Sequence, residues 1–256
     1  MGTYNDEGVV LRTHRLGEAD RIITILTRRH GKLRGVARGV RRTSSRFGAR
    51  LEPFAQVDLQ ITQSRTLDIF TSVVSKNLFG KDFLGDYVRY TAAEVMAEVA
   101  DKLVAEEGES ALRFYLLLVG ALRALGEGTV DGVRPAAMIL DSYILRAATL
   151  SGYSPQLDSC AICGSPGRHG FFHPASGGMV CLRCRPPGSA SVSAATAAYL
   201  TALLAGDWPA TRDVPDTRIA EVSELVRAFL TWHVERGVKS LSHVDPGLNI
   251  PDDTDY

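Results

Sequence analysis

The hydrophobic pattern of this 256-residue chain changes near residue 80, and that change restricts the fold more than any other feature. Before residue 80, apolar residues come in short runs rich in Val, Ile and Thr, some of them alternating with polar residues, which is typical of β-strands. After it, apolar residues recur every three to four positions, which is typical of amphipathic helices. We therefore predict an α+β multidomain protein with a boundary between Ser75 and Lys81.

Five strand-length segments precede this boundary, and turn residues separate them. The pair His30-Gly31 is predicted to form the centre of a two-residue hairpin turn, because glycine accepts positive φ. Five short strands without a strong helix predict a small antiparallel β-barrel over residues 1–80, of the OB type or the SH3-like type. The predicted strands are Gly8–Thr13, Arg21–Thr27, Lys32–Val40, Gln56–Thr62 and Leu67–Val74.

The remainder of the chain is predicted to be an α-helical domain over residues 81–245. Helical spacing starts at Val88, Ser110 is a candidate cap for the second helix, and Gly237 is expected to end the last one. The tail, residues 246–256, is expected to be disordered because it is short and polar. Beyond the first two, the predicted helices are Pro135–Leu150, Ser193–Leu204 and Thr217–Arg236.

Charge is distributed unevenly, although 29 basic and 29 acidic side chains cancel overall. Residues 1–80 hold 14 Lys and Arg against 7 Asp and Glu, whereas residues 81–256 hold 15 against 22. The basic excess is concentrated between residues 28 and 50, where no acidic residue occurs. A long acid-free run on a small barrel favours contact with a polyanion over a merely solvated surface. The candidate nucleic-acid contacts are Arg28, Arg29, Lys32, Arg34, Arg38, Arg41, Arg42, Arg46 and Arg50.

Aromatic side chains near this run are few, namely Phe47, Phe54 and Phe70. Each is expected in the core rather than stacked on a base, which favours phosphate contacts and binding without sequence preference. Within the run, the segment from Arg38 to Arg46 is the preferred contact, because loop arginines can all reach one backbone whereas strand residues alternate between faces.

All four cysteines lie in two C-x-x-C pairs separated by 17 residues, Cys160 with Cys163 and Cys181 with Cys184. This spacing is typical of a structural zinc site with four thiolate ligands, and it predicts a zinc-binding insertion over residues 156–190. An iron–sulfur cluster uses the same ligands, and His169 or His173 is a possible substitute ligand. Disulfides and a redox-active pair are less favoured, since nothing indicates export and no βαβ unit surrounds the motif. Gly177-Gly178 is predicted as the turn of a short hairpin between the pairs.

Several stretches together resemble the RecO family of bacterial recombination mediators. They are EADRIITILTRRHGKLRGVARGVRRTSSRFGARLEPF, SGYSPQLDSCAICG, GGMVCLRC and FLTWHVERGVKSL, and the similarity extends from Gly8 to about His243. The resemblance implies an OB barrel followed by a helical domain with a zinc-binding insertion. It also matches the four cysteines to the family's ligands, and Arg34, Arg38, Arg41, Arg42 and Arg46 to its basic stretch.

The resemblance implies a non-catalytic function in DNA repair. The family binds single- and double-stranded DNA, anneals complementary strands, acts with RecR, and remodels single-strand binding protein so that the recombinase can load. The acidic tail of single-strand binding protein is then expected to dock on the helical domain.

Two other classes of function are weighed against a DNA-binding mediator. An enzyme is disfavoured, because the phosphate-binding, nucleophile-elbow and metalloprotease motifs are missing from the sequence and the acidic cluster Glu106, Glu107 and Glu109 is typical of a solvated helix end. The alternative is a zinc-ribbon adaptor that binds RNA or ribosomes. No secretory signal and no apolar run of about 20 residues is visible, so we expect a cytoplasmic, nucleoid-associated protein without membrane contact.

Overall fold

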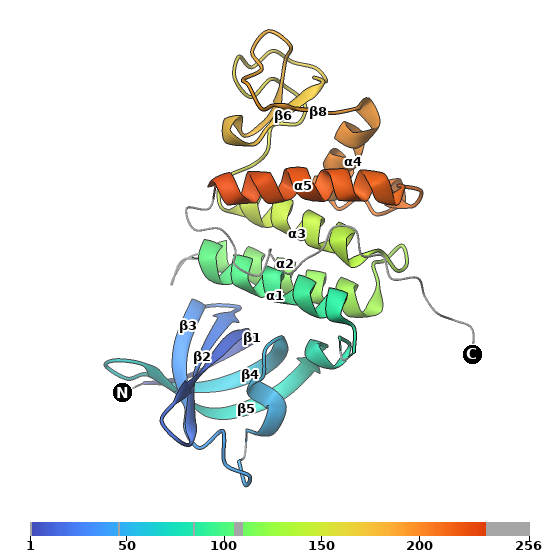
Figure 1. Ribbon diagram of the computed structural model, residues 1–256. Helices are drawn as coiled ribbons and strands as arrows, with labels where there is room; N and C mark the ends of the chain where they lie inside the picture. Colours follow the sequence, from blue (N-terminus) through green and yellow to red (C-terminus); the bar gives the residue numbers. More distant parts are fainter. Residues whose placement is uncertain (1, 46, 84, 105–109, 234–256) are drawn as a thin grey trace, which may run out of the picture. The chain divides into compact units, whose positions relative to one another are not determined.

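The computed structural model describes residues 2–45, 47–83, 85–104 and 110–233, and it shows a β-barrel, helices and a small three-stranded sheet (Figure 1). The chain divides into two compact units, residues 1–127 and residues 128–256. The predicted tail, Arg46, and the predicted end of the last helix at Gly237 lie outside the described residues.

The first unit contains a closed five-stranded barrel with the strand order β1-β2-β3-β5-β4. Four of the neighbouring pairs are antiparallel, and the β3–β5 pair is parallel. This arrangement confirms the predicted OB-type barrel, with the single parallel pair as a departure from an all-antiparallel one. The strands are β1 (Thr3–Leu16), β2 (Asp20–Thr27), β3 (Gly31–Ala37), β4 (Ala55–Thr62) and β5 (Asp68–Leu78).

Strand β1 is longer than predicted because it serves two neighbours. Its first half pairs with β4, from Thr3 opposite Thr62 to Val9 opposite Gln56. Its second half pairs with β2, and the register shifts between Val10 and Arg12. Such a bulge bends a strand and increases its twist, which lets one strand turn the corner of a small barrel.

The barrel core is formed by aliphatic side chains from all five strands, among them Val10, Ile25 and Ile61. The three phenylalanines expected in the core are indeed buried: Phe47, Phe54 and Phe70 expose 2%, 2% and 1% of their surface. Gly35 lies where β3 and β5 pair, and a Cβ atom there would approach the Phe70 ring to 2.7 Å. Only glycine fits this position without displacing the ring.

The turn between β2 and β3 differs from the prediction. Thr27 pairs with Gly31, so three residues, Arg28 to His30, form the turn, and Gly31 opens β3 with a φ of +75°. The predicted two-residue turn centred on His30-Gly31 is therefore wrong. The buried carboxylate of Asp6 fixes the observed turn, because its Oδ2 accepts from the backbone N–H groups of Arg29 (3.3 Å) and His30 (3.2 Å). A long-range partner of this kind leaves no local signal in the turn sequence.

Two helices follow the barrel in the same unit, α1 (Tyr87–Leu103) and α2 (Ser110–Glu127). Both pack on the barrel, α1 on β1 and α2 on β1, β2 and β3. A buried polar network fixes α2: the Tyr115 hydroxyl donates to Glu7 Oε1 (2.6 Å), and Gln56 Nε2 donates to the same oxygen (2.7 Å). The compact unit thus extends beyond the domain predicted for residues 1–80, and independent folding of that domain remains a prediction.

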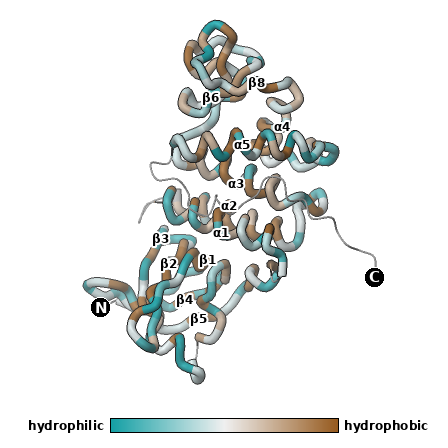
Figure 2. The backbone as a smooth tube through the Cα atoms, viewed as in Figure 1, coloured by the Kyte–Doolittle hydropathy of each residue, from teal (hydrophilic) through white to brown (hydrophobic). Residues whose placement is uncertain are grey.

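The second unit contains three helices and a small sheet. The helices are α3 (Ala136–Leu150), α4 (Ala194–Ala205) and α5 (Asp216–His233), and the sheet has the order β7-β6-β8. Its strands are β6 (Phe171–His173), β7 (Gly178–Val180) and β8 (Ala190–Ser191). Figure 2 shows hydrophobic residues along α3, and its side chains from Met138 to Leu145 are buried. Helix α4 begins as predicted, since Ser193 Oγ accepts from the Thr196 N–H (3.0 Å).

A buried carboxyl group lies at the packing of α3 and α5. Asp141 is 4% exposed, and Ser223 Oγ donates to its Oδ2 at 2.6 Å. Burial raises the pKa of Asp141 to about 7, although the Ser223 hydrogen bond opposes the shift. Because this pKa is above that of an unfolded aspartate, the folded state binds more protons between these two values.

We expect the stability of the protein to fall as the pH rises from about 4 to about 7 through this group. Asp141→Asn removes the titration, so the variant should gain stability relative to wild type across this range and keep a constant difference above it. Urea unfolding of the full chain at several pH values measures this. Asp158→Asn, at an exposed position in the same unit, is the matched control. A pH-independent difference between Asp141→Asn and wild type would contradict the expectation.

Candidate metal centre and nucleic-acid interface

Each cysteine pair lies on a tight turn closed by backbone hydrogen bonds. In the first, the Cys160 carbonyl accepts from the Gly164 N–H at 2.8 Å, and Gly164 has a φ of +69°. In the second, the Cys181 carbonyl accepts from the N–H groups of Cys184 (3.1 Å) and Arg185 (3.0 Å). These turns bring the two thiols of each pair to the same side.

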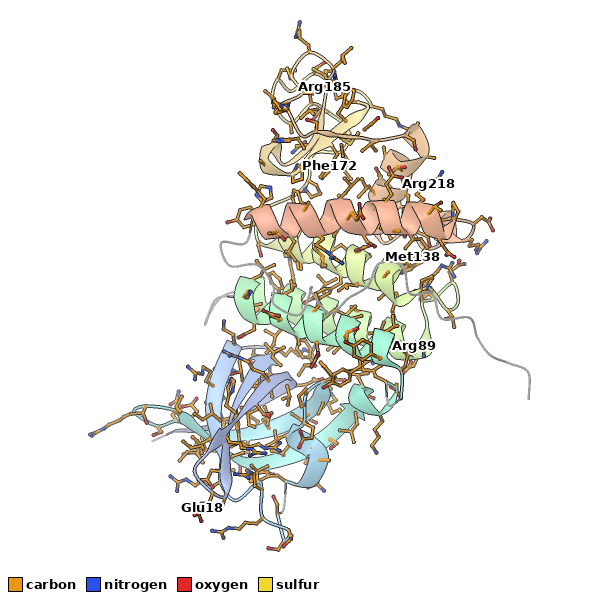
Figure 3. The ribbon with its side chains drawn as sticks, viewed as in Figure 1. Glu18, Arg89, Met138, Phe172, Arg185 and Arg218 are labelled. Carbon is orange, nitrogen blue, oxygen red and sulfur yellow. The ribbon has the colours of Figure 1, made fainter. Side chains whose placement is uncertain are left out.

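Strand β7 brings the two turns together. It ends at Val180, directly before Cys181, and the Met179 carbonyl accepts from the Ala161 N–H at 2.8 Å. Gly178 makes the closest approach, since a Cβ atom there would lie 2.3 Å from the Gln156 carbonyl oxygen. Gly178 therefore belongs to the strand, and the turn before it is the 3-10 helix Pro174–Ser176 with Gly177 (φ +84°), rather than the predicted Gly177-Gly178 pair. In Figure 3 Phe172 of β6 lies between the sheet and α5, where its ring is 6.3 Å from that of Phe229.

The four thiols converge, with all four Sγ atoms within 4.8 Å of one another. No disulfide joins these cysteines, and among the described residues no side chain other than cysteine belongs to the cluster. A tetrahedral zinc ion with Zn–S bonds of about 2.3 Å places its sulfur atoms about 3.8 Å apart, so this donor set fits a zinc ion after small shifts. The two nearby histidines bind elsewhere: His169 Nε2 is 2.9 Å from the Ser165 carbonyl oxygen, and His173 Nδ1 is 2.8 Å from Ser176 Oγ.

The thiols affect one another's ionisation. Backbone N–H groups of Cys163 and then Cys181 lower the pKa of Cys160 to about 6. In contrast, hydrogen bonds with Cys181 and then Cys163 raise the pKa of Cys184 to about 12. Four sulfurs this close cannot all carry negative charge unless a cation neutralises them, which is the electrostatic condition that a bound metal ion satisfies.

The basic run does not form one continuous patch. Arg28 and Arg29 lie in the β2–β3 turn, whereas Arg38, Arg41 and Arg42 follow the other end of β3. Six residue steps along β3 separate these ends by about 20 Å, at roughly 3.3 Å per residue. We call Arg38, Arg41 and Arg42 the tip arginines; all three are exposed.

Arg28 and Arg29 line a groove of about 460 Å³ on the outside of β1, β4 and β5. The groove also contains the carboxylates of Asp6, Glu7 and Asp58. Arg28 is already paired with Glu7 at 3.5 Å. With three acidic and two basic side chains, this end of the barrel is electrostatically less suited to a polyanion than the tip arginines.

The loop that contains the tip arginines is held to the β1–β2 turn through Gly39 and Arg41. The Arg41 N–H donates to the Ala19 carbonyl at 3.0 Å, and Arg41 Nη1 donates to the Gly17 carbonyl at 3.2 Å. In addition, the Gly39 N–H donates to Asp20 Oδ1 at 2.7 Å. Glu18, labelled in Figure 3, marks this end of the barrel. The loop after β3 is thus tied to a second loop, and its arginines Arg38, Arg41 and Arg42 remain exposed.

The other predicted contacts are distributed along the same strand and loop. Arg34 is exposed on the outer face of β3, and Arg50 is exposed in the 3-10 helix Gly48–Leu51. Lys32 instead lies against α1, where its Nζ donates to the Asp101 carbonyl (2.5 Å) and lies 3.5 Å from Asp101 Oδ1. Its side chain is only 16% exposed. The structure therefore brings Arg34 and the tip arginines to one region, and places Lys32 under a helix.

Strand β1 contributes basic residues that sequence reasoning missed. Arg12 on β1 and Arg34 on β3 both lie opposite Thr24 of β2, so the three residues form one row on the outer face of the sheet. Arg15, also on β1, is exposed and lies opposite Arg21. Arg65 is exposed in the β4–β5 loop, three residues before Asp68, which pairs with Gly35 of β3. The alternation of Arg12 and His14 in the sequence indicates that both side chains lie on one face of β1. Only the strand order shows that this face continues into the basic face of β3.

Comparison with known proteins agrees with this architecture. The family model described as "Recombination protein O N terminal" matches residues 1–79, and "Recombination protein O C terminal" matches residues 84–242. The chain belongs to the RecO family. Three RecO relatives named "DNA repair protein RecO" are similar over nearly their whole length. The protein of Cutibacterium acnes is 55% identical over 94% of this chain and 98% of its own.

The other two RecO proteins come from Nocardioides sp. and Thermobifida fusca. The first is 51% identical, covering 94% of this chain and 99% of its own, and the second is 49% identical, covering 96% and 99%. Membership places the chain in a family of DNA repair and recombination proteins, as the resemblance implied. Within the described part of the chain, no helix is both long and apolar enough to span a membrane.

Removing one thiolate should release the metal and destabilise the second unit. We expect Cys181→Ser to lower the metal content from about one ion per chain to near zero, because a closed site with one ligand missing holds its ion weakly. Elemental analysis of the purified protein, together with thermal unfolding with and without a chelator, measures both effects. Ile162→Ala, within the first turn but without a ligand atom, is the control. Equal melting of chelated and untreated wild type would argue against a structural metal.

Proposed function

We propose that this protein is a non-catalytic recombination mediator that binds single- and double-stranded DNA without sequence preference. The observation that carries the proposal is the group of exposed arginines formed by Arg34, in the middle of β3, and the tip arginines, whose loop is bonded to the β1–β2 turn. OB barrels bind oligonucleotides on the face of strands 2 and 3 and on the loops between strands 1 and 2 and between strands 4 and 5. Arg34 lies on β3, and the tip arginines lie in the β3–β4 loop, which is bonded to the β1–β2 turn. Arg46 and Arg50 are included in the proposed surface.

Contacts in this surface are proposed to be with phosphates. The phenylalanines near the basic run are buried and therefore unavailable for stacking on bases. Arginine–phosphate contacts read no sequence, and they make affinity strongly dependent on salt. Arg28 and Arg29 would contribute less, since both lie in a groove with acidic side chains. Lys32 is paired with Asp101 in the DNA-free protein.

Four thiolates would hold one structural Zn²⁺ in this protein, with Cys160, Cys163, Cys181 and Cys184 as its ligands. The support is the convergence of the four Sγ atoms and the engagement of both nearby histidines with other partners. An all-thiolate site leaves no open coordination position, so the ion would stabilise the fold and would not act on a substrate.

We propose that the same surface supports strand annealing and recombinase loading. Bringing two strands together requires neutralisation of phosphates while base edges stay free to pair, and arginines on an aromatic-poor surface meet both conditions. We further propose that RecR and the acidic tail of single-strand binding protein are partners, with the tail docking on the helical part, as the family resemblance implies. We also propose that the protein is located in the cytoplasm, at the nucleoid.

Replacing the tip arginines together by alanine should weaken DNA binding across all sequences. The slope of log K against log salt should flatten by up to about 0.7 per lost contact on single strands and about 0.9 on duplex DNA. Fluorescence anisotropy with two unrelated oligonucleotides at several salt concentrations measures this. Arg113→Ala/Arg123→Ala/Arg146→Ala removes three exposed helical arginines and controls for net charge. Unchanged affinity of the tip variant at low salt would contradict the proposal.

An annealing assay distinguishes the proposed mediator from the other two classes. Complementary strands coated with cognate single-strand binding protein should anneal with wild type and several-fold more slowly with the tip variant, because the variant cannot neutralise both backbones. Metal-dependent strand cleavage would instead indicate a nuclease. Preference for structured RNA over single-stranded DNA in competition would indicate the zinc-ribbon adaptor.

A further inference from the structure

One carboxylate of α1 lies on the basic outer face of the barrel. Asp101, in the last turn of α1, has its Oδ2 3.0 Å from Arg12 Nε of β1 and its Oδ1 3.5 Å from Lys32 Nζ of β3. Its carbonyl oxygen accepts from the same Lys32 Nζ at 2.5 Å. The C-terminal turn of a helix carries partial negative charge, so both the side chain and the backbone present an anionic group to the two cations.

Arg12 and Lys32 are neighbours of the exposed Arg34. Arg12 shares a row with Arg34 across the sheet, since both lie opposite Thr24. Lys32 precedes Arg34 by two residues on β3, on the same face and about 7 Å away along the strand. The three cations therefore form one group. Asp101 forms ion pairs with Arg12 and Lys32, and Arg34 is exposed.

The contact has features of an exchangeable one. The Arg12 side chain is 47% exposed, so water reaches its ion pair with Asp101 and screens it, whereas the Lys32 and Asp101 side chains are each 16% exposed. Helix α1 is also held by other means: Asp86 caps its start by accepting from the Arg89 N–H (2.9 Å), and its buried face includes Met96 and Ala100. Release of one carboxylate would leave these contacts in place.

We propose that Arg12 and Lys32 form a phosphate-binding site that Asp101 occupies in the DNA-free protein. When DNA lies along Arg34 and the tip arginines, its backbone phosphates replace the Asp101 carboxylate on Arg12 and Lys32. The internal anion makes the barrel bind DNA more weakly than its cations alone would, and favours a polyanion, which offers several phosphates at once, over single anions. This inference rests on the proposed DNA-binding function.

Replacing the competitor by a neutral group of the same shape tests the site. Asp101→Asn should bind single-stranded DNA about three- to tenfold more tightly than wild type at low salt, since two cations are released for phosphate contact. Glu98→Gln is the matched control, because it removes one negative charge from the same helix but its partner is Lys102 on α1. The gain of Asp101→Asn should largely disappear when Arg12→Ala and Lys32→Ala are added. Equal affinities of Asp101→Asn and Glu98→Gln, or a gain that persists in that background, would overturn the proposal.

A second variant keeps the test valid if Asp101→Asn loosens α1, which circular dichroism and thermal unfolding would reveal. Lys32→Gln retains a donor for the Asp101 carbonyl and removes the charge. A lysine that only fastens the helix would leave DNA affinity unchanged, and that result would contradict the site. We expect a several-fold loss.

The same titrations separate this inference from the proposed function. If wild type does not bind DNA, the proposed function fails. If wild type binds and the tip variant binds weakly, while Asp101→Asn matches Glu98→Gln, only the competition by Asp101 fails.

Discussion

The pairing of β3 with β5 closes the barrel, and the position of the arginines depends on it. These two strands approach where Gly35 leaves room for the Phe70 ring, 2.7 Å from where a Cβ atom would be. Closure directs the chain after β3 over the β1–β2 turn, where Arg41 is fixed by two backbone carbonyls. A larger side chain at position 35 would separate β3 from β5. It would thereby displace the basic surface, although Gly35 is not part of that surface.

Much of this architecture was predictable, because it depends on local patterns. Alternating apolar residues in β4 and the spacing of the four cysteines each specify their structure within a short window. The features that were missed depend on distant partners. The β2–β3 turn is set by Asp6, 24 residues before His30, and the row of Arg12 with Arg34 is set by strand order. Sequence reasoning has no access to such pairings without a template.

The basic run illustrates why contiguity in sequence is a poor guide to a surface. Nine cations within residues 28–50 suggest one footprint, yet a strand of seven residues separates Arg29 from Arg38 and places them at opposite ends of the barrel. Acidic groups then determine what each cation is available for. Arg28 is paired with Glu7 and Lys32 with Asp101, whereas the tip arginines are exposed. The count of charges is therefore less informative than the count of unpaired ones.

A protein that must release DNA as well as bind it benefits from cations that have an internal partner. An arginine exposed to water in the free state gives its full electrostatic attraction to phosphate, which speeds association and strengthens binding at low salt. An arginine paired with a carboxylate in the free state returns to that partner when DNA leaves, so part of the attraction cancels. In this barrel the exposed group, Arg34 with the tip arginines, would set the initial contact, and the pair held by Asp101 would extend it only where several phosphates arrive together. Such a division suits binding that is sequence-independent and reversible, because it limits affinity without removing any contact from the bound state.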